Sequence, residues 1–348
     1  MRAICYHGPG DVRLEEIPEP QVGAQQVKIK VAWNGICGSD LHYYSHGLVK
    51  LPQEATLSPV VMGHEMSGTI VEVGPEVNTS RLRVGLNVVV YGKDACGGGL
   101  AEYISVDEDL VHVLPDGITR SQRPSMCYVV DVGALMEPLA VMWHAAKQSN
   151  MQAGDKVLIL GAGPIGLLAA RVVRVFGASW IAVSEPALKR RQLATLHGAD
   201  VVYDPTAPGV DVAAAVREAT GGHGADVVFD CAGHQDTLDT ALHAVRPRGS
   251  VVNVAAWVGK PVLDIDAVTH REVRFTGALA YNRVHGEMLE AVAAGKFDGL
   301  ENLITRRITL EELVEKGIKA LMYEKDEQGC RKANVFAAAV KILVRPDL

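Results

Sequence analysis

The chain has 348 residues, of which 48% are hydrophobic and 22% charged, a balance typical of a folded protein of about two domains. Lys and Arg number 34 and Asp and Glu 41, so the net charge of −7 excludes a global positive field for nucleic acid or an anionic membrane. The six cysteines contain no CxxC pair, which favours a reducing, cytoplasmic compartment over a disulfide framework.

The apolar stretches predict neither export nor a membrane span. Residues 1–10 alternate polar and apolar types and lack the apolar core of a signal peptide. The longest charge-free stretch in the apolar middle, 157–170, is interrupted by Gly and Pro and is shorter than the roughly 18 residues of a spanning helix. We therefore expect neither a membrane nor a nucleic acid as partner.

The first part of the chain, to about residue 118, predicts a β-rich domain, because short strand-like runs alternate there with Gly, Pro and Asn. The expected strands are 27–32, 67–73, 87–91, 102–106 and 110–114.

From residue 155 the pattern changes to apolar strand-like runs that alternate with helical stretches, as in a parallel sheet covered by helices. The expected strands are 156–160, 180–184, 201–203, 226–230 and 250–254, and the expected helices are 165–176, 188–197, 212–220 and 237–244. A helix over 310–322 and a closing strand over 339–344, with no obvious partner, complete the chain. This pattern predicts an α/β fold with a doubly wound, dinucleotide-type domain.

A glycine pattern follows the first strand of that domain. Gly161, Gly163 and Gly166 stand between a strand and a helix, the context in which this spacing indicates dinucleotide binding. The first glycine permits a tight turn, the second lets the backbone approach a pyrophosphate, and the third lets the helix pack closely on the strand. The helix N-terminus then offers free N–H groups to the phosphate oxygens.

An acid stands at the end of the second strand of the same domain. Glu185 can accept hydrogen bonds from both ribose hydroxyls and would repel a 2′-phosphate, so NAD is favoured over NADP. The basic residues Lys189, Arg190 and Arg191 follow closely and weaken this exclusion, although a solvated helix face is their ordinary interpretation.

Three motifs carry a resemblance to a known family: residues 35–42 (GICGSDLH), 63–65 (GHE) and 137–141 (EPLAV). With them the sequence resembles the zinc-dependent medium-chain dehydrogenases, and within these the polyol branch that includes sorbitol and butanediol dehydrogenases. The resemblance covers nearly the whole chain. It implies a GroES-like catalytic domain over 1–150, completed by about 294–348, and a Rossmann NAD-binding domain over 151–293.

The resemblance also implies the residues of a catalytic zinc site. It matches Cys37, His64 and Glu137 to zinc ligands and Glu65 to a ligand that comes and goes as water and substrate exchange. Asp40 matches a carboxylate that orients the ligand histidine. Taken singly, each residue has an ordinary structural explanation, such as a buried small Cys or a helix-start acid.

Further residues are implied for the proton and the cofactor. Ser39 and His42 match a relay that carries the alcohol proton to solvent with help from the nicotinamide ribose. The expected cofactor contacts are Gly161, Gly163, Pro164, Ile165, Gly166, Glu185, Arg190, Ala232, Val254, Ala278 and Leu279.

The sequence departs from the family pattern in three places. Most zinc-containing relatives have a lobe of four cysteines for a structural zinc, but here the corresponding interval, 93–96, contains only Cys96. One thiol cannot build a closed four-ligand site, so we expect one zinc per chain. Segments 120–130 and 329–338 look like extra sequence, and a natural short subfamily and a gene-model error remain alternatives.

The expected function is reversible, NAD-linked oxidation of a secondary alcohol, either a small vicinal diol such as 2,3-butanediol or a polyol such as sorbitol or xylitol. Two rival functions stay open: a zinc-free reductase of the same superfamily, and a catalytically silent NAD-binding protein. We expect a homo-oligomer, either a dimer or a tetramer.

Overall fold

The computed structural model describes the chain except for residues 48–59, 92–97, 116–125, 258, 324–338 and 348. The chain forms two compact units: Met1–Glu137 with Leu289–Glu324 and Ala339–Leu348, and Pro138–Met288. The first break lies near the start of helix α3 (Met136–Gln148), whereas the sequence analysis placed the domain boundary just beyond the end of this helix. Across the described part of the chain, no helix has the length and apolar character to cross a membrane.

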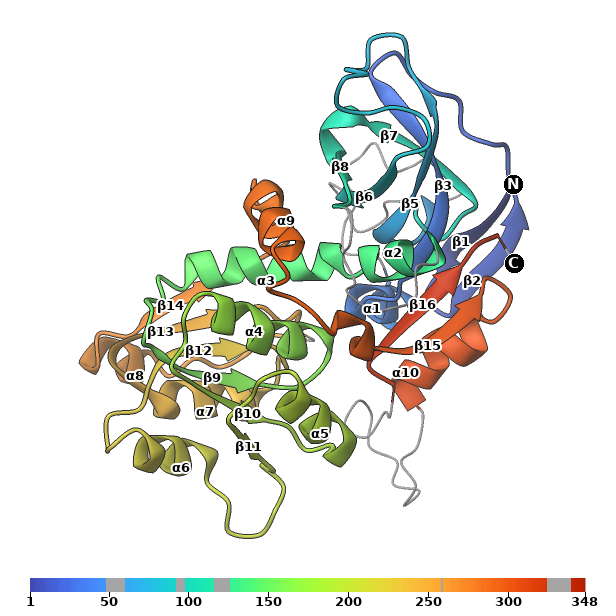
Figure 1. Cartoon of the computed structure of the whole chain (residues 1–348). Coiled ribbons are helices and arrows are strands. Elements are labelled where there is room, and N and C mark those ends of the chain that lie inside the picture. The colour runs from blue at the N-terminus through green and yellow to red at the C-terminus, as the bar shows by residue number, and fades with distance from the viewer. Residues whose placement is uncertain (48–59, 92–97, 116–125, 258, 324–338, 348) are drawn as a thin grey trace. The chain divides into compact units, whose positions relative to one another are not determined.

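The first unit is built on β-sheets, which confirms the prediction of a β-rich first domain (Figure 1). A small sheet has the order β2-β1-β4. A larger sheet has the order β15-β16-β3-β5-β6-β8, and β7 pairs with β3. The strands are β1 (Arg2–Gly8), β2 (Asp11–Glu16), β3 (Gln26–Gly35), β4 (Val60–Val61), β5 (Glu65–Val73), β6 (Asn87–Tyr91), β7 (Tyr103–Asp107), β8 (Val111–Val113), β15 (Ile304–Thr309) and β16 (Lys341–Arg345).

Alternation along these strands creates the core of the first unit. Val27, Ile29 and Val31 of β3 face inward and pack with Met66 and Ile70 of β5, and all five side chains are fully buried. The helices α1 (Gly38–His46), α2 (Met126–Gly133) and α10 (Lys319–Tyr323) accompany the sheets.

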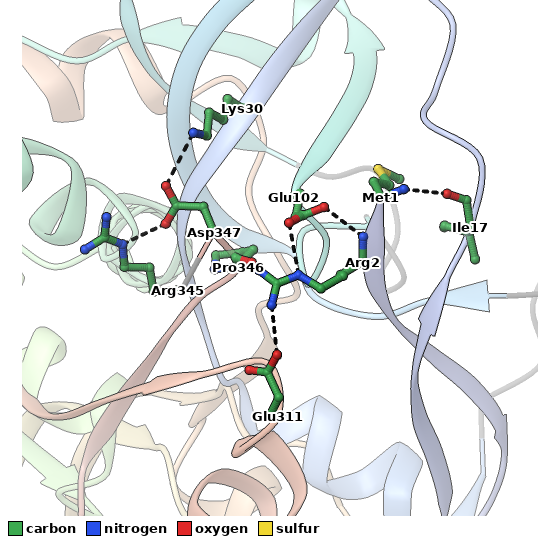
Figure 2. A network of polar contacts seen from close by, with 9 residues as sticks. All are labelled: Met1, Arg2, Ile17, Lys30, Glu102, Glu311, Arg345, Pro346 and Asp347. Atoms are coloured by element: carbon green, nitrogen blue, oxygen red, sulfur yellow. Dashed lines mark hydrogen bonds and ion pairs between the residues drawn. The ribbon is translucent and has the colours of Figure 1, made fainter.

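The closing strand predicted at 339–344 is present as β16, and the structure identifies its partners. It lies parallel to β15 and antiparallel to β3, so the end of the chain is built into the first unit. Figure 2 shows the polar contacts that fasten both chain ends there. The Arg2 guanidinium reaches Glu102 at 3.1 Å and Glu311 at 2.8 Å, and it donates to the carbonyl of Pro346 at 2.8 Å.

The predicted helix over 310–322 is interrupted. A π-helical turn, Leu313–Ile318, precedes α10, so the element is not one regular helix. The turn contains Gly317, whose hydrogen faces Ile36: a Cβ there would lie 2.6 Å from the Ile36 side chain. Gly317 therefore lets this turn pack closely against Ile36, just beyond the end of β3.

The second unit is a parallel sheet of order β11-β10-β9-β12-β13-β14, as the doubly wound pattern predicts. Its strands are β9 (Lys156–Leu160), β10 (Trp180–Ser184), β11 (Val201–Tyr203), β12 (Ala225–Asp230), β13 (Val245–Asn253) and β14 (Arg274–Gly277). Its helices include α4 (Pro164–Val175), α5 (Leu188–Leu196), α6 (Val212–Ala219), α7 (Gln235–Ala244) and α8 (Ile265–His270), and α9 (His285–Ala293) follows β14. The order reverses between β9 and β12, the position where such sheets bind ligands at their carboxyl edge.

Candidate active site and dinucleotide site

Three potential metal ligands gather in the first unit. The ligand atoms of Cys37, His64 and Glu65 all lie within 4.8 Å of one another. Cys37 follows β3 and caps α1, His64 precedes β5, and Glu65 opens β5 opposite Gly35 of β3. Gly35 must lack a side chain, because a Cβ there would lie 2.0 Å from the Glu65 carboxylate. The antiparallel pairing of β3 and β5 therefore brings together the two motifs that the sequence analysis treated as one site.

A lysine from the closing strand also enters this cluster. The Lys341 ammonium lies 2.5 and 2.8 Å from the two Glu65 carboxylate oxygens and donates to the carbonyl of Ile36 at 3.0 Å. Only 1% of Lys341 is exposed, so the ion pair is fully buried. Sequence reasoning missed this residue, although a single lysine within the apolar run 339–344 was a visible signal.

Glu137 lies in the first turn of α3, in the electrostatic field of the same cluster. It is buried, and burial together with the nearby Glu65 and Asp40 carboxylates raises its pKa to about 7, against the opposing charges of His64 and Lys341. Among the described residues, the three-ligand group above does not include Glu137. The structure thus places the fourth predicted ligand near the cluster but outside the tight group.

The electrostatics of the cluster favour a bound cation. Burial acts to lower the pKa of His64, but Cys37, Asp40 and Glu137 outweigh it and raise that pKa well above its ordinary value. Burial raises the pKa of Asp40, whose Oδ2 accepts the Cys37 N–H at 2.9 Å. A thiol, an imidazole and carboxylates are the ligand types that zinc prefers, and a cation here would offset the concentrated negative charge. The residues present fit a zinc ion.

The two predicted proton carriers lie on α1. The Ser39 hydroxyl is buried, and it has no hydrogen-bond partner among the residues that the structure describes. His42 is half-buried and stacks on the exposed His46 with ring centroids 4.8 Å apart. His46 lies one turn further along the same helix, so it extends the predicted proton route toward solvent.

In the second unit, the glycine loop has the geometry of a phosphate site. Gly161 adopts φ +94°, a left-handed conformation that suits glycine. A Cβ on Gly166 would lie 1.9 Å from the Gly161 carbonyl, so the helix can approach the loop only without one. The space around Gly163 is open, as a backbone that must meet a pyrophosphate requires. Pro164 begins α4 and has no N–H, which leaves the N–H groups of Ile165 and Gly166 for an anion.

Glu185 is buried at the end of β10 and is held by two backbone N–H groups. Oε2 accepts the N–H of Ala162 in the glycine loop at 2.8 Å, and Oε1 accepts the N–H of Ala187 at 2.9 Å. A carboxylate has about four acceptor positions, so each oxygen keeps one free for a hydroxyl donor. This arrangement matches the two hydroxyls of a ribose.

The remaining predicted cofactor contacts lie at the same carboxyl edge of the sheet. Ala232 follows β12 with its N–H bonded to Asp230, Val254 follows β13, and Ala278 follows β14. Leu279 is 90% exposed and precedes Ala280, which has a left-handed φ of +51°. Burial lowers the pKa of the largely buried Arg190, while Glu185 opposes this shift.

Several departures from the family pattern fall outside the described residues: Cys96 with the interval 93–96, the segment 329–338, and residues 120–125 of the segment 120–130. The zinc count therefore stays a prediction.

Two family models match the chain: "Alcohol dehydrogenase GroES-like domain" over residues 23–116 and "Zinc-binding dehydrogenase" over residues 164–294. The (R,R)-butanediol dehydrogenase of Neisseria gonorrhoeae is 35% identical over 381 residues, with both chains fully covered. The sorbitol dehydrogenase of Rattus norvegicus is 29% identical, with 90% of each chain covered.

Solved structures show the same fold. The 2R,3R-butanediol dehydrogenase of Bacillus subtilis aligns with a TM-score of 0.84 and 34% identity over 99% of each chain. A putative zinc-binding dehydrogenase from Sinorhizobium meliloti, solved with NADP bound, aligns with a TM-score of 0.79 and 28% identity over 99% of each chain. These likenesses confirm the α/β fold with a GroES-like first domain.

Proposed function

Because the chain belongs to the zinc-dependent medium-chain alcohol and polyol dehydrogenase family, we propose that it reversibly oxidises a small secondary alcohol to a ketone with NAD. The substrate class is a vicinal diol such as 2,3-butanediol, the class named in the relatives that are 35% identical over the full chain. The reaction converts alcohol and NAD⁺ to ketone, NADH and one proton.

The observation that carries this proposal is the group of half-buried Cys37 with buried His64 and Glu65. A zinc-free reductase has no use for a thiol, an imidazole and a carboxylate whose ligand atoms lie within 4.8 Å of one another. A silent NAD-binding protein has no use for the half-buried His42 stacked on His46. The cluster therefore favours metal-assisted alcohol chemistry over both rivals.

Cys37, His64 and Glu137 would hold the zinc. Glu65, which is ion-paired with Lys341, would bind the zinc only part of the time, as water and substrate exchange. Bound there, zinc supplies a Lewis acid that lowers the pKa of the substrate hydroxyl, and the nicotinamide supplies the hydride acceptor. With the Glu137 carboxylate as a ligand, the site is harder and more polar than a second thiolate would make it, which suits a diol.

The chain itself moves the proton. The buried Ser39 hydroxyl is available to accept the substrate's hydroxyl proton and to pass its own proton on, because no protein group among the described residues engages it. His42 then takes up the proton that Ser39 passes on. Because His42 stacks on the exposed His46, this proton can leave for solvent from the two rings.

Glu185 supports NAD as the cofactor, since a buried carboxylate with one free acceptor position on each oxygen binds a ribose diol and repels a 2′-phosphate. The proposal further includes one zinc per chain, a cytoplasmic location and a homo-oligomer.

The test combines metal analysis with a substrate screen. Purified protein is analysed for zinc, and NAD reduction is measured with butanediol stereoisomers, sorbitol, xylitol and simple alcohols. Zinc together with turnover of a butanediol supports the proposal. Turnover confined to sorbitol or xylitol would favour the polyol alternative, which the similarity to sorbitol dehydrogenases supports. Tight NADH binding without turnover of any alcohol would favour the alternative of a catalytically silent NAD-binding protein.

A further inference from the structure

We propose that Arg191 and Asp204 form a clamp that positions Glu185 and thereby determines the preference for NAD over NADP. The inference rests on the proposed NAD-linked function and names residues beyond the ribose-binding acid that help to determine it.

Arg191 is hydrogen-bonded to the turn that carries Glu185. From the first turns of α5, its Nη1 donates to the carbonyl of Glu185 at 2.7 Å and to the carbonyl of Pro186 at 2.6 Å. Its Nη2 lies 2.9 Å from the Asp204 carboxylate, just beyond the end of β11. The Arg191 side chain is only 14% exposed, so this is a largely buried, charge-assisted contact.

Asp204 is held in turn on its other oxygen. Its Oδ1 accepts the N–H of Thr206 at 3.0 Å and the Thr206 hydroxyl at 2.6 Å, which leaves Oδ2 for Arg191. Burial acts to raise the pKa of Asp204, but Thr206 and Arg191 outweigh it and lower that pKa below its ordinary value. The carboxylate is therefore a fixed anion beside the guanidinium.

The clamp reaches the Glu185 side chain through one peptide group. The carbonyl of Pro186 and the N–H of Ala187 belong to the same planar peptide unit, so a donor bound to the carbonyl sets where the N–H points. That N–H donates to Glu185 Oε1, while Ala162 of the glycine loop binds Oε2. Arg191 thus fixes the plane of the carboxylate and leaves its free acceptor positions facing the ribose.

The same pairing withholds a positive charge from a 2′-phosphate. The guanidinium lies at the end of β10 beside the acid, where it could otherwise attract an anion, but Asp204 neutralises it. Removing Glu185 alone therefore ends the repulsion of NADP but leaves Arg191 paired with Asp204. The full gain in NADP binding, beyond what the neighbouring Arg190 can supply, needs Arg191 to be released as well.

The experiment compares Arg191→Met with Arg191→Lys and with a matched control, Arg174→Met. Arg174 has the same contact pattern elsewhere in this unit: it donates to the carbonyls of Ala178 and Gly198 and pairs with Asp200 at 2.7 Å. Arg191→Met is expected to raise Kd for NADH and KM for NAD about tenfold, the factor that 1.4 kcal/mol represents, with kcat nearly unchanged. Arg191→Lys restores part of the loss, and Arg174→Met changes neither constant.

A second arm tests the specificity claim with Glu185→Ser, Asp204→Asn and their combination. Asn keeps Oδ1 for Thr206 but turns an amide toward Arg191, which breaks the ion pair. The double variant is expected to bind NADPH more tightly than the product of the two single effects allows, because only it combines a released Arg191 with no repelling acid.

Cofactor constants for Arg191→Met that match those of Arg174→Met would overturn the clamp, as would simple additivity in the second arm. These outcomes leave the proposed oxidation intact. Equal affinity of the unaltered protein for NADH and NADPH would instead overturn the NAD assignment, and the inference with it.

Discussion

Replacing Lys341 with Met tests how much the buried ion pair contributes to the first unit. The substitution leaves the Glu65 carboxylate, 1% exposed, without its cation and leaves the Ile36 carbonyl without its donor. Breaking one partner of a buried pair costs about 3–5 kcal/mol, because an uncompensated charge remains inside. For a unit of this size, that is a fall in melting temperature of roughly 6–20 °C.

The measurement is thermal and urea unfolding of the zinc-free protein, so that metal does not mask the loss. Lys341→Arg, which keeps the charge, should recover most of the stability. The double variant Glu65→Gln with Lys341→Met should be more stable than Lys341→Met alone, since it no longer buries a lone anion. A loss below about 1 kcal/mol would refute the reasoning, because that is the value of an exposed pair.

Four further outcomes follow. Cys37→Ser or His64→Ala should abolish turnover with NADH affinity unchanged in fluorescence titration, and His42→Ala should lose less than about 100-fold in kcat, since water can replace an outer proton carrier. In zinc-free protein the unfolding free energy should fall as pH rises from about 4.5 to about 7, because folded Glu137 retains a proton that the unfolded chain has released; Glu137→Gln should flatten this slope in urea titrations. Metal analysis should give one zinc per chain, and a chelator should remove activity before the protein melts; two tightly bound ions would contradict this count. Glu185→Ala should reduce the ratio of kcat/KM for NAD over NADP, and an unchanged ratio would remove the acid from cofactor selection.

The parallel sheet was the most predictable part of the fold. The strands β9, β10 and β11 have the predicted bounds, because each is a short apolar run that ends at a turn or at a charged or glycine residue. The start of β13 was missed by five residues. Its first part contains Pro247 and the left-handed Arg248, and the register shifts there, so this part lacks the continuous apolar pattern of a central strand.

Helix α3 was not predicted, for a different reason. Its residues Leu139, Ala140, Met142 and Ala145 are all fully buried, and polar residues on the outer side are confined to its last turns, so the periodic signal is weak. Periodicity therefore gave no position for Glu137, and only the family resemblance connected it with Glu65.

Ion pairs between residues far apart in the chain could not be predicted from the sequence. Arg191 stands in a run of three basic residues that a solvated helix face explains equally well, and nothing local indicates that Asp204 of the next strand end neutralises it. Lys341 likewise meets a carboxylate 276 residues away, through the insertion of β16 beside β3. Pattern reasoning finds residues that act through neighbours in sequence and misses those that act through neighbours in the sheet.

The two sites use a buried glutamate in opposite ways, and the donors explain the difference. The Lys341 ammonium neutralises the Glu65 carboxylate, so this carboxylate can lie close to a thiol and an imidazole. Two backbone N–H groups orient Glu185, and the largely buried Arg190 lies within electrostatic range of its carboxylate. A carboxylate fixed by one backbone donor on each oxygen keeps acceptor positions for hydroxyl donors, whereas an ammonium bound to both oxygens, as in Glu65, occupies them. The donors around each acid, more than the acid itself, therefore distinguish the proposed metal site from the proposed cofactor site.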